Sequence, residues 1–586
     1  MTIKISRRRL IGLSVISCQL SLSVALTACS DFDDYNKEAA FDSAESSMTI
    51  WENIASQPNL SQFADVLKKG GYDQELANSR FYTVWAPENG TFNYDSLMNV
   101  DNETLVYKFI KSHVANYNYT LRSQKYNERV HMLNEKSFTL AGDAGLFTFD
   151  DKQMTRTNVP SLNGVFHTMS GAVQFLPNIY ENIFETAGVD SIADFYARYE
   201  TSEIDTKRSV EGPIDEDGNQ TYSDTVLVVS NTMTGRNYLN ADLSNEDSSY
   251  TMLLPTNEAY VEAYNKIKKC FNYATTTQYW AFDQKTGIPS SATNRSVAAG
   301  LSDSLTRRMI YLNTVFNNNQ KYNRWLQNVD DPDRSDTLYS TRNTKLSNGP
   351  EILSRTLGGA MKMSNGWTRV IDSLAIRPWE TYNPELNVEI ARSEYRPLVR
   401  AATAANRYLV NGVTGEYLFR YVDLTPASET SATEAYFYIN GVRSTTYNVY
   451  MVMIPSTEDL VYVPESGIGR YHCAVVGATS PARSYKFNVT LNYANANGTV
   501  SSTSSPAVNF GTFTSDSLAI DTIFLGQVTF PVSYVNVNNC YPYIMVRSQR
   551  STWNRSEWNT FDNRLRISDI ILRPVEYDEY LKKEEE

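Results

Sequence analysis

The stretch Tyr82-Thr-Val-Trp-Ala-Pro-Glu-Asn-Gly-Thr-Phe92 decides the fold, because the chain repeats it as Tyr250-Thr-Met-Leu-Leu-Pro-Thr-Asn-Glu-Ala-Tyr260. The two stretches share Tyr, Thr, Pro and Asn in register. A second pair follows downstream, with Asn163-Gly-Val-Phe-His-Thr-Met-Ser-Gly-Ala-Val173 matching Asn365-Gly-Trp-Thr-Arg-Val-Ile-Asp-Ser-Leu-Ala375. Two motifs that occur twice in the same order predict two copies of one domain.

The local chemistry of these motifs predicts a strand, its end and a turn. Apolar residues from Phe81 to Trp85 would fill a core, and Pro87 would stop the strand because proline has no amide donor. Asn89 and Asn257 are placed to cap the segment after each strand. The Asn-Gly pairs favour a tight turn ahead of a closing strand. Ahead of the first motif, residues at helical spacing predict helix before Gly70-Gly71, namely Trp51, Ile54, Leu60, Phe63, Val66 and Leu67.

The two motifs resemble the fasciclin-like domain, whose first motif is close to Thr-Val-Phe-Ala-Pro-Thr-Asn-Glu-Ala-Phe and whose second is close to Asn-Gly-Val-Ile-His-Val-Ile-Asp. The resemblance implies a compact α/β wedge of strands and small helices. Copy one would cover residues 47–178 and copy two residues 179–386.

Two histidines of the first copy lie in segments to which the resemblance gives a function. His113 and His167 fall where fasciclin-like domains carry histidines, in segments that the family's animal members use in cell adhesion and integrin contact. This chain departs from the pattern, because Ser112 replaces the usual Tyr and copy two has Arg369 in place of the second histidine. We therefore expect His167 to be a hydrogen-bonded core histidine.

Copy two carries insertions. Its motifs begin about 115 residues apart, from Tyr250 to Asn365, against about 81 in copy one, so about 34 residues are inserted. Another long polar segment, residues 202–248, precedes Tyr250. Insertions of this size lie on the surface and either carry binding specificity or decorate the fold. We favour a role in binding.

The pattern changes at about Asn387. Apolar Tyr485, Phe487, Val489, Leu491 and Tyr493 alternate with polar residues, which is the period of a strand with one buried face. Further strands are expected at residues 447–454, 470–476, 523–530, 543–546 and 565–572. Their spacing predicts a β-sandwich over residues 387–580. The segment 565–574 resembles the last strand of carbohydrate-binding jelly rolls, and residues 581–586 are expected to form a disordered charged tail. The fold class is thus multidomain α+β, with two fasciclin-like α/β wedges followed by an all-β, jelly-roll-like sandwich.

The amino terminus reads as a bacterial export signal. Lys4 and Arg7 to Arg9 precede an apolar stretch that is too short and too interrupted for a membrane span. The order Leu26-Thr-Ala-Cys29 resembles the lipobox of bacterial lipoproteins, which implies cleavage after residue 28 and acylation of Cys29. Residues 29–46 would be the acylated tether. Its acidic start resembles the signal that sends lipoproteins of the Bacteroidetes to the outer face of the outer membrane.

Charge and cysteine content exclude several classes of protein. Removal of the signal leaves 49 of the 53 basic residues against 66 acidic ones, a formal charge of about −17. Such a chain would be repelled by nucleic acid and by anionic membrane surfaces. Cys270, Cys473 and Cys540 form no disulfide framework, although Cys473 and Cys540 could form one bridge.

No motif for catalysis or metal binding is present in the sequence. His113, His131, His167 and His472 lack the companions that a zinc site needs, and there is no Gly-x-Ser-x-Gly nucleophile motif. We expect no metal, no cofactor and no enzymatic activity. Carboxylate pairs of glycosidases come from distant segments, however, and are invisible to this search.

Late aromatic residues suggest a ligand platform. Tyr541, Tyr543, Trp553 and Trp558 cluster with polar donors, as in proteins that hold sugar faces, although aromatics in a sandwich are more often core. The preferred function is a non-catalytic surface lipoprotein that binds a glycan or peptide or scaffolds a complex, beside a SusC/SusD-type importer of the outer membrane. The alternative is an adhesin that contacts cells or matrix through its fasciclin-like copies.

Overall fold

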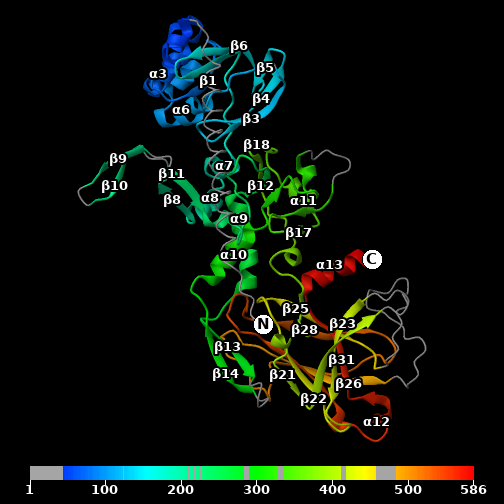
Figure 1. Ribbon diagram of the computed structural model, residues 1–586. Helices are drawn as coiled ribbons and strands as arrows, with labels where there is room; N and C mark the ends of the chain where they lie inside the picture. The colour runs from blue at the N-terminus through cyan, green and yellow to red at the C-terminus, as the bar shows by residue number, and fades with distance from the viewer. Residues whose placement is uncertain are drawn as a thin grey trace, which may run out of the picture. The chain divides into compact units, whose positions relative to one another are not determined.

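The computed structural model describes residues 44–585, apart from 123, 205, 207–209, 216–217, 225–226, 283–288, 328–334, 411–416 and 457–482 (Figure 1). The signal segment and the expected lipidation site at Cys29 lie outside the described residues, as do His472, Cys473 and the strand expected at 470–476. Contacts divide the chain into two compact units. Unit 1 runs to Asn182 and also includes Ser244–Ser248 and Lys362–Gly366, and unit 2 comprises the rest.

Unit 1 has a helical layer over one face of a sheet. Apolar residues at helical spacing form α2 and α3 with their buried faces in one core, and the predicted helix end lies at Gly70. Pro58 separates the two helices, because proline is accepted only in a first turn. The α-helices of this unit are α2 (Ile50–Ser56), α3 (Ser61–Lys69), α4 (Tyr72–Glu75), α5 (Tyr94–Asn99) and α6 (Asn102–Lys108), with α7 (Ile179–Glu185) beginning inside it.

The sheet of unit 1 has seven strands in the order β2-β1-β7-β6-β5-β4-β3. The two motif strands, β1 and β7, pair in parallel, with Tyr82 opposite Gly164. Gly164 has φ +137°, and a Cβ there would lie 1.9 Å from the Tyr82 carbonyl oxygen, so the predicted Asn-Gly turn requires glycine. The strands are β1 (Tyr82–Pro87), β2 (Val114–Asn116), β3 (Tyr126–His131), β4 (Ser137–Asp143), β5 (Leu146–Phe149), β6 (Lys152–Ser161) and β7 (Gly164–Met169).

The asparagines of the first motif do not cap the segment after each strand, so that prediction is wrong. Asn89 Oδ1 accepts a hydrogen bond from Gln62 N at 2.9 Å, and Asn257 Oδ1 accepts one from Ser191 N at 2.9 Å. Each asparagine therefore holds the start of an earlier helix, which is a tertiary contact that local capping rules do not contain. The cap of the helix after Asn257 is Thr256 instead.

A four-stranded sheet has the order β15-β12-β19-β18, and β15 and β12 belong to the first part of unit 2. Tyr250 pairs with Asn317 in the register in which Tyr82 pairs with Asn116. The elements are α8 (Asp190–Ala197), β12 (Tyr250–Pro255), α9 (Asn257–Lys268), α10 (Leu301–Tyr311), β15 (Val315–Asn317), β16 (Leu338–Tyr339), β17 (Lys345–Leu346), α11 (Gly349–Ser354), β18 (Met361–Met363) and β19 (Gly366–Ile371).

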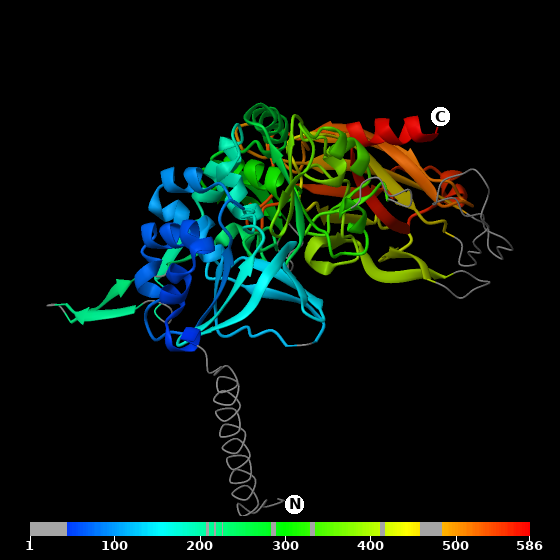
Figure 2. The same ribbon diagram turned by 90° about the horizontal axis from the view of Figure 1, so that it is seen from above.

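The polar segment before Tyr250 forms two successive β-ribbons that extend away from α8 (Figure 1 and Figure 2). The ribbon of β8 (Glu200–Ile204) and β11 (Leu227–Asn231) is followed by that of β9 (Val210–Ile214) and β10 (Gln220–Asp224). Every residue of β8 is exposed, so this insertion lies on the surface as expected.

The carboxy-terminal part contains two six-stranded sheets that share one apolar core. Residues 485, 487, 489 and 491 of β26 are all buried, and the predicted alternation holds from Tyr485 to Val489. Beyond that it fails, because Thr490 and Asn492 are buried as well and Tyr493 is only partly buried. One sheet consists of β20 (Leu386–Asn387), β22 (Ala402–Val410), β23 (Tyr417–Pro426), β25 (Thr446–Met453), β28 (Asp521–Thr529) and β31 (Leu565–Pro574). The other consists of β21 (Leu398–Arg400), β24 (Glu434–Tyr438), β26 (Ser484–Asn492), β27 (Val508–Thr514), β29 (Tyr543–Ser548) and β30 (Phe561–Asp562), with α12 (Glu557–Thr560) beside it.

One segment between the two motifs of the second half contacts this carboxy-terminal part, and the favoured role of the insertions in binding stays a prediction. This segment forms a hairpin of β13 (Thr276–Phe282) and β14 (Pro289–Ser296). Gln278 N donates to the Gly498 carbonyl at 2.7 Å, and the Tyr438 hydroxyl donates to the Trp280 carbonyl at 2.9 Å. The hairpin thus packs on the chain's own sheets because its aromatic side chains find partners there.

The carboxy terminus also differs from expectation. Residues 581–585 belong to helix α13 (Val575–Glu585), not to a disordered tail. Asp578 anchors the helix, because its carboxylate accepts from Asn448 Nδ2 at 2.6 Å and from Arg573 Nη1 at 2.9 Å.

Candidate functional site

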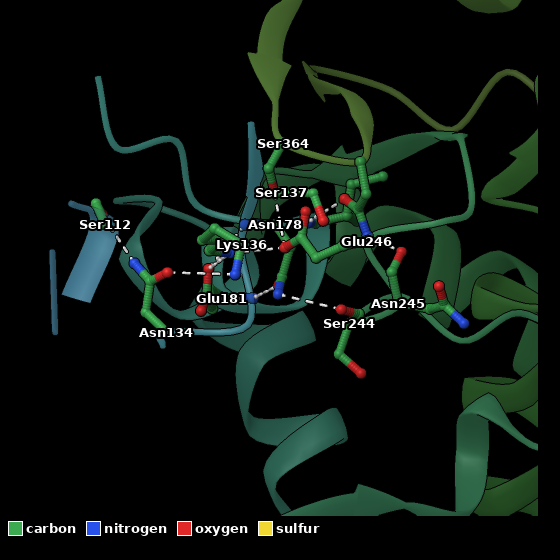
Figure 3. A network of polar contacts seen from close by, with 12 residues as sticks. Ser112, Asn134, Lys136, Ser137, Asn178, Glu181, Ser244, Asn245, Glu246 and Ser364 are labelled. Carbon is green, nitrogen blue, oxygen red and sulfur yellow. Dashed lines mark hydrogen bonds and ion pairs between the residues drawn. The ribbon is translucent and has the colours of Figure 1, made fainter. Parts of the chain in front are cut away.

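A buried ion cluster surrounds Lys136 in the interior of unit 1 (Figure 3). Lys136 lies in the turn between β3 and β4, and its side chain is 2% exposed. Its ammonium lies 2.6 Å from Glu181 Oε2 and 2.9 Å from Glu246 Oε1. The ring of Phe175 lies 5.2 Å away and excludes water from one side.

Glu181 is fixed at the start of α7. Its Oε2 accepts from the Asn178 amide at 2.7 Å while its own amide donates to Asn178 Oδ1 at 2.9 Å, which is a reciprocal helix cap. The Tyr107 hydroxyl donates to Glu181 Oε1. Burial, and then this hydrogen bond to a carboxylate, raise the pKa of Tyr107 far above its ordinary value.

Glu246 comes from the short segment 244–248, far along the chain from β4. Its Oε1 also accepts from Ser364 Oγ at 3.0 Å, and its backbone carbonyl accepts from Arg129 Nη1 at 3.0 Å. Its other carboxylate oxygen has no hydrogen-bond partner among the described residues. Lys136 therefore contacts Glu181 and Glu246 directly and is linked to Ser364 through Glu246, so three segments that are distant in the sequence meet at one lysine.

The cluster contributes little to the free energy of folding, but it fixes where the segments that carry its carboxylates lie. A buried ion pair gains little over apolar residues of the same volume, but removal of one partner leaves an uncompensated charge that costs about 3–5 kcal/mol. Lys136 is consequently a positioning residue, which fixes segments 244–248 and 362–366 on unit 1.

A surface hollow lies beside the cluster. It has a volume of about 460 Å³ and is lined by Asn102, Glu103, Val106, Tyr107 and Lys111 of the α6 region. Tyr107 links the two features, since it lines the hollow and bonds Glu181. The hollow is open to solvent, so it does not enclose a ligand as the pockets for drug-sized molecules do.

The two histidines that the resemblance points to are buried. The Asn158 amide donates to His167 Nδ1 at 3.1 Å, so Nε2 carries the proton and donates to the Tyr119 carbonyl at 3.1 Å. His113 Nε2 accepts from the Val173 amide at 3.2 Å, so its Nδ1 donates to the Phe109 carbonyl. Burial lowers the pKa of both to about 4. The expectation of a core histidine at 167 is confirmed, and neither ring is open to a partner.

The predicted aromatic platform is distributed over two clusters. Tyr543 is 3% exposed, and Tyr541 packs near Tyr438, so these two rings belong to the aromatic contacts beneath the β13–β14 hairpin. Tyr543 therefore offers no face to a sugar. Trp553 and Trp558 both contact Arg550, whose guanidinium lies 5.0 Å from the ring centroid of Trp553 and 3.5 Å from that of Trp558.

Trp558 differs from the other three, because it is 44% exposed. Arg550 is buried and its Nε donates to the Glu429 carbonyl, so the guanidinium supports the indole from within the fold. A supported ring with an exposed face is the geometry that binds a sugar face.

The described cysteines are buried and unreactive. Cys270 and Cys540 are free thiols, and burial raises the pKa of Cys270 to about 11 and that of Cys540 to about 12. No group of His, Cys, Asp and Glu side chains that could hold a metal occurs within the part of the chain that the structure describes. Among the same residues, no helix is long and apolar enough to cross a membrane.

Comparison with known proteins supports the resemblance for the first copy. Residues 58–174 match the family model of the Fasciclin domain, so the fasciclin-like domain predicted at 47–178 is confirmed there. The chain thus contains a Fasciclin domain in a mixed α/β fold. No curated protein matches the chain.

Two solved structures show a distant likeness. A FAS1 domain pair from the insect cell adhesion molecule fasciclin I is 11% identical and covers 55% of this chain and 98% of its own, with a TM-score of 0.19. A Paenibacillus xanthan lyase is 11% identical and covers 30% of this chain and 12% of its own, with a TM-score of 0.17. Such scores establish no common fold, and the likenesses carry no conclusion about this chain.

Proposed function

We propose that this chain is a non-catalytic cell-surface lipoprotein that binds a glycan or peptide, as an accessory subunit of a SusC/SusD-type importer of the outer membrane. Acyl chains on Cys29 would hold it at the outer face. The observation that carries the ligand-binding part is the exposed indole of Trp558, supported on the buried Arg550. The proposal of an importer rests on the lipobox and the acidic start of the tether.

The proposed architecture includes a second fasciclin-like copy at 179–386 and a jelly-roll-like sandwich at 387–580. Matching hydrogen bonds support the second copy. Asn163 Oδ1 accepts from Ile50 N at 2.8 Å at the start of α2, as Asn365 Oδ1 accepts from Ile179 N at 2.9 Å at the start of α7. The two six-stranded sheets with one shared core support the sandwich.

The first experiment is a pull-down of the lipidated protein from native outer membranes through a carboxy-terminal tag. Recovery of a SusC/SusD-type pair supports the accessory role, because tethering beside a transporter raises the effective concentration of a captured ligand. Recovery without any importer subunit counts against it. Loss of membrane association in Cys29→Ala tests the anchor separately.

A second experiment tests the glycan-binding surface. Trp558→Ala should weaken retention of the full chain in affinity electrophoresis on the polysaccharide it binds by tenfold or more, because stacking on the ring is lost. Tyr408→Ala removes another exposed ring from the same sheets, 54% exposed, and is the matched control. Equal retention of the two variants would remove Trp558 from the proposal.

The alternative function is adhesion to cells or matrix, which the Fasciclin domain at 58–174 favours. Since His113 and Ser112 are fully buried, adhesion would use other surfaces of that domain. Binding of the cells to immobilised matrix that depends on residues 58–174, with no importer recovered in the pull-down, would favour this alternative.

A further inference from the structure

Two tyrosine rings, one exposed and one partly buried, pack together in the first part of unit 2, separate from the Lys136 cluster and from the carboxy-terminal aromatic clusters. The ring of Tyr322 is 57% exposed and lies 4.9 Å from the ring of Tyr339 on β16. A large exposed ring that packs on a partly buried one presents a flat, amphipathic surface.

The pair is held in place by a buried asparagine. Asn323 is fully buried, and its Oδ1 accepts from the Tyr339 amide at 2.9 Å. Its Nδ2 donates to the Tyr339 carbonyl at 2.7 Å and to the Asn317 carbonyl at 3.1 Å. The turn that carries Tyr322 is thereby fixed against β16, so the two rings are positioned before any ligand arrives.

Four cationic residues occur in the segments that carry the two rings. Lys345 is paired directly opposite Tyr339 in the β16–β17 hairpin, which places both side chains on one face. Arg342 lies in the turn of that hairpin, with its Nη1 2.7 Å from the Arg236 carbonyl oxygen. Lys321 and Arg324 flank Tyr322 in the chain.

The local charge is opposite to that of the whole chain. The segments 235–240, 317–327 and 335–346 carry five basic side chains, all exposed, and one acid, Asp336, within a chain of formal charge −13. The intervening stretch 328–334, with three aspartates and one arginine, lies outside the described residues.

We propose that this surface, formed by Tyr322, Tyr339, Arg342 and Lys345, binds an acidic glycan, a sugar chain that bears carboxylate or sulfate groups. The rings would stack on sugar faces, and the cations would bind the anionic substituents. The inference rests on the proposed glycan-binding function and specifies a charged substrate class for a second surface.

The test measures binding of polygalacturonate, dextran sulfate and neutral dextran to the full mature chain by affinity electrophoresis and calorimetry. We expect binding of at least one acidic polymer and at least tenfold weaker binding of neutral dextran. Binding of the acidic polymer should weaken severalfold between 50 and 300 mM NaCl, because salt screens exposed charges. Preference for polygalacturonate or for dextran sulfate distinguishes a carboxylate from a sulfate ligand.

Two variants and a matched control assign the site. The double variant Arg342→Gln with Lys345→Gln should weaken binding of the acidic polymer tenfold or more. The variant Tyr322→Ala should weaken this binding severalfold, but the dependence of binding on salt should stay unchanged. Arg555→Gln removes one exposed cation from the carboxy-terminal part and should change nothing.

The outcomes separate this inference from the proposed function. Binding of neutral glycans that depends on Trp558, without binding of either acidic polymer, overturns the inference and leaves the proposed function standing. Acidic binding that is unchanged in the double variant overturns the assignment to this surface. Binding of no glycan at all overturns the inference together with the glycan-binding part of the proposed function, and leaves binding of a peptide to the pull-down.

Discussion

Lys136 shows how a single residue can decide where distant segments lie. The ammonium is desolvated, so it must have a partner, and Glu246 supplies one from 110 residues further along the chain. Glu181 supplies the other and is satisfied independently by Asn178 and Tyr107. Glu246, at 8% exposure, therefore depends on the lysine far more than Glu181 does, at 25%.

We predict that Lys136→Met destabilises unit 1 in the full chain by about 3 kcal/mol, because the Glu246 carboxylate is left buried without a cation. The added change Glu246→Gln should restore most of this loss, since it removes the unpaired charge. Hydrogen exchange of amides in β1 and β7 measures the free energy of opening. Equal destabilisation in the single and double variants would contradict the prediction.

The buried histidines predict a dependence of stability on pH. Their pKa values of about 4 lie below the ordinary 6.5, so between these values the unfolded chain binds more protons than the folded one. Stability should thus rise from pH 4 to pH 6.5 and be lost as the pH falls, by about 3 kcal/mol for each histidine over the full range. Calorimetry of the transition that Lys136→Met shifts measures this effect.

The variant His167→Gln should show a smaller acid-induced loss than the unaltered chain, even if it is less stable at neutral pH. His131→Gln removes an exposed histidine and is the control. If the loss between pH 6.5 and pH 4 is the same in all three proteins, the buried histidines do not cause it.

The structural roles of some residues could be predicted from the sequence, and those of others could not. The core role of His167 could be predicted, because the Asn-Gly-Val-Phe-His-Thr-Met stretch is a buried strand motif. Lys136 could not, since its partners lie 45 and 110 residues away and lysine is ordinarily a surface residue. The role of Arg550 could not be predicted either, because its contacts with the rings of Trp553 and Trp558 depend on how the loop that carries them folds.

At the scale of elements, the β13–β14 hairpin depends on one glycine. Gly498 has φ +82°, and a Cβ there would lie 1.9 Å from the Thr276 carbonyl oxygen. The hairpin can lie against this loop only because no side chain intervenes. Trp280 Nε1 then donates to the Ser501 carbonyl at 2.9 Å.

We predict that Gly498→Ala detaches the hairpin from the sheets, because the clash involves backbone atoms that cannot move aside cheaply. Amides of β13 should exchange at least tenfold faster. Gly511→Ala is the matched control, since Gly511 has φ +97° but nothing within 4 Å of its Cβ position. Equal behaviour of the two variants would mean that backbone strain alone is responsible.

Helices and strands whose apolar residues recur at a regular spacing could be predicted from the sequence, whereas the packing of one element on another could not. The alternation from Tyr485 to Val489 in β26 and the helical spacing of α2 and α3 follow from one buried face on each of these segments. The contact of the β13–β14 hairpin with the carboxy-terminal sheets produces no such regular spacing in the sequence. It depends on Gly498 and on aromatic partners more than 100 residues away.

At the scale of the whole molecule, unit 1 is not a continuous stretch of sequence. Its compact unit includes Ser244–Ser248 and Lys362–Gly366, and both segments meet at Glu246 through Ser364. A chain that ends at Asn182 keeps the Fasciclin domain match at 58–174 but lacks the partner that encloses Lys136. Solvent would reach the ammonium in such a fragment.

This difference gives a prediction with a built-in comparison. In a fragment of residues 44–182, Lys136→Met should cost less than about 1 kcal/mol, because an exposed ammonium next to Glu181 contributes little. The same substitution in the full chain should cost about 3 kcal/mol, because Glu246 is then buried without its cation. Denaturant unfolding of the fragment, set against hydrogen exchange of the same strands in the full chain, gives the two values. Equal costs would show that Lys136 acts within the first domain alone, whereas a larger cost in the full chain would show that the lysine couples that domain to the two later segments.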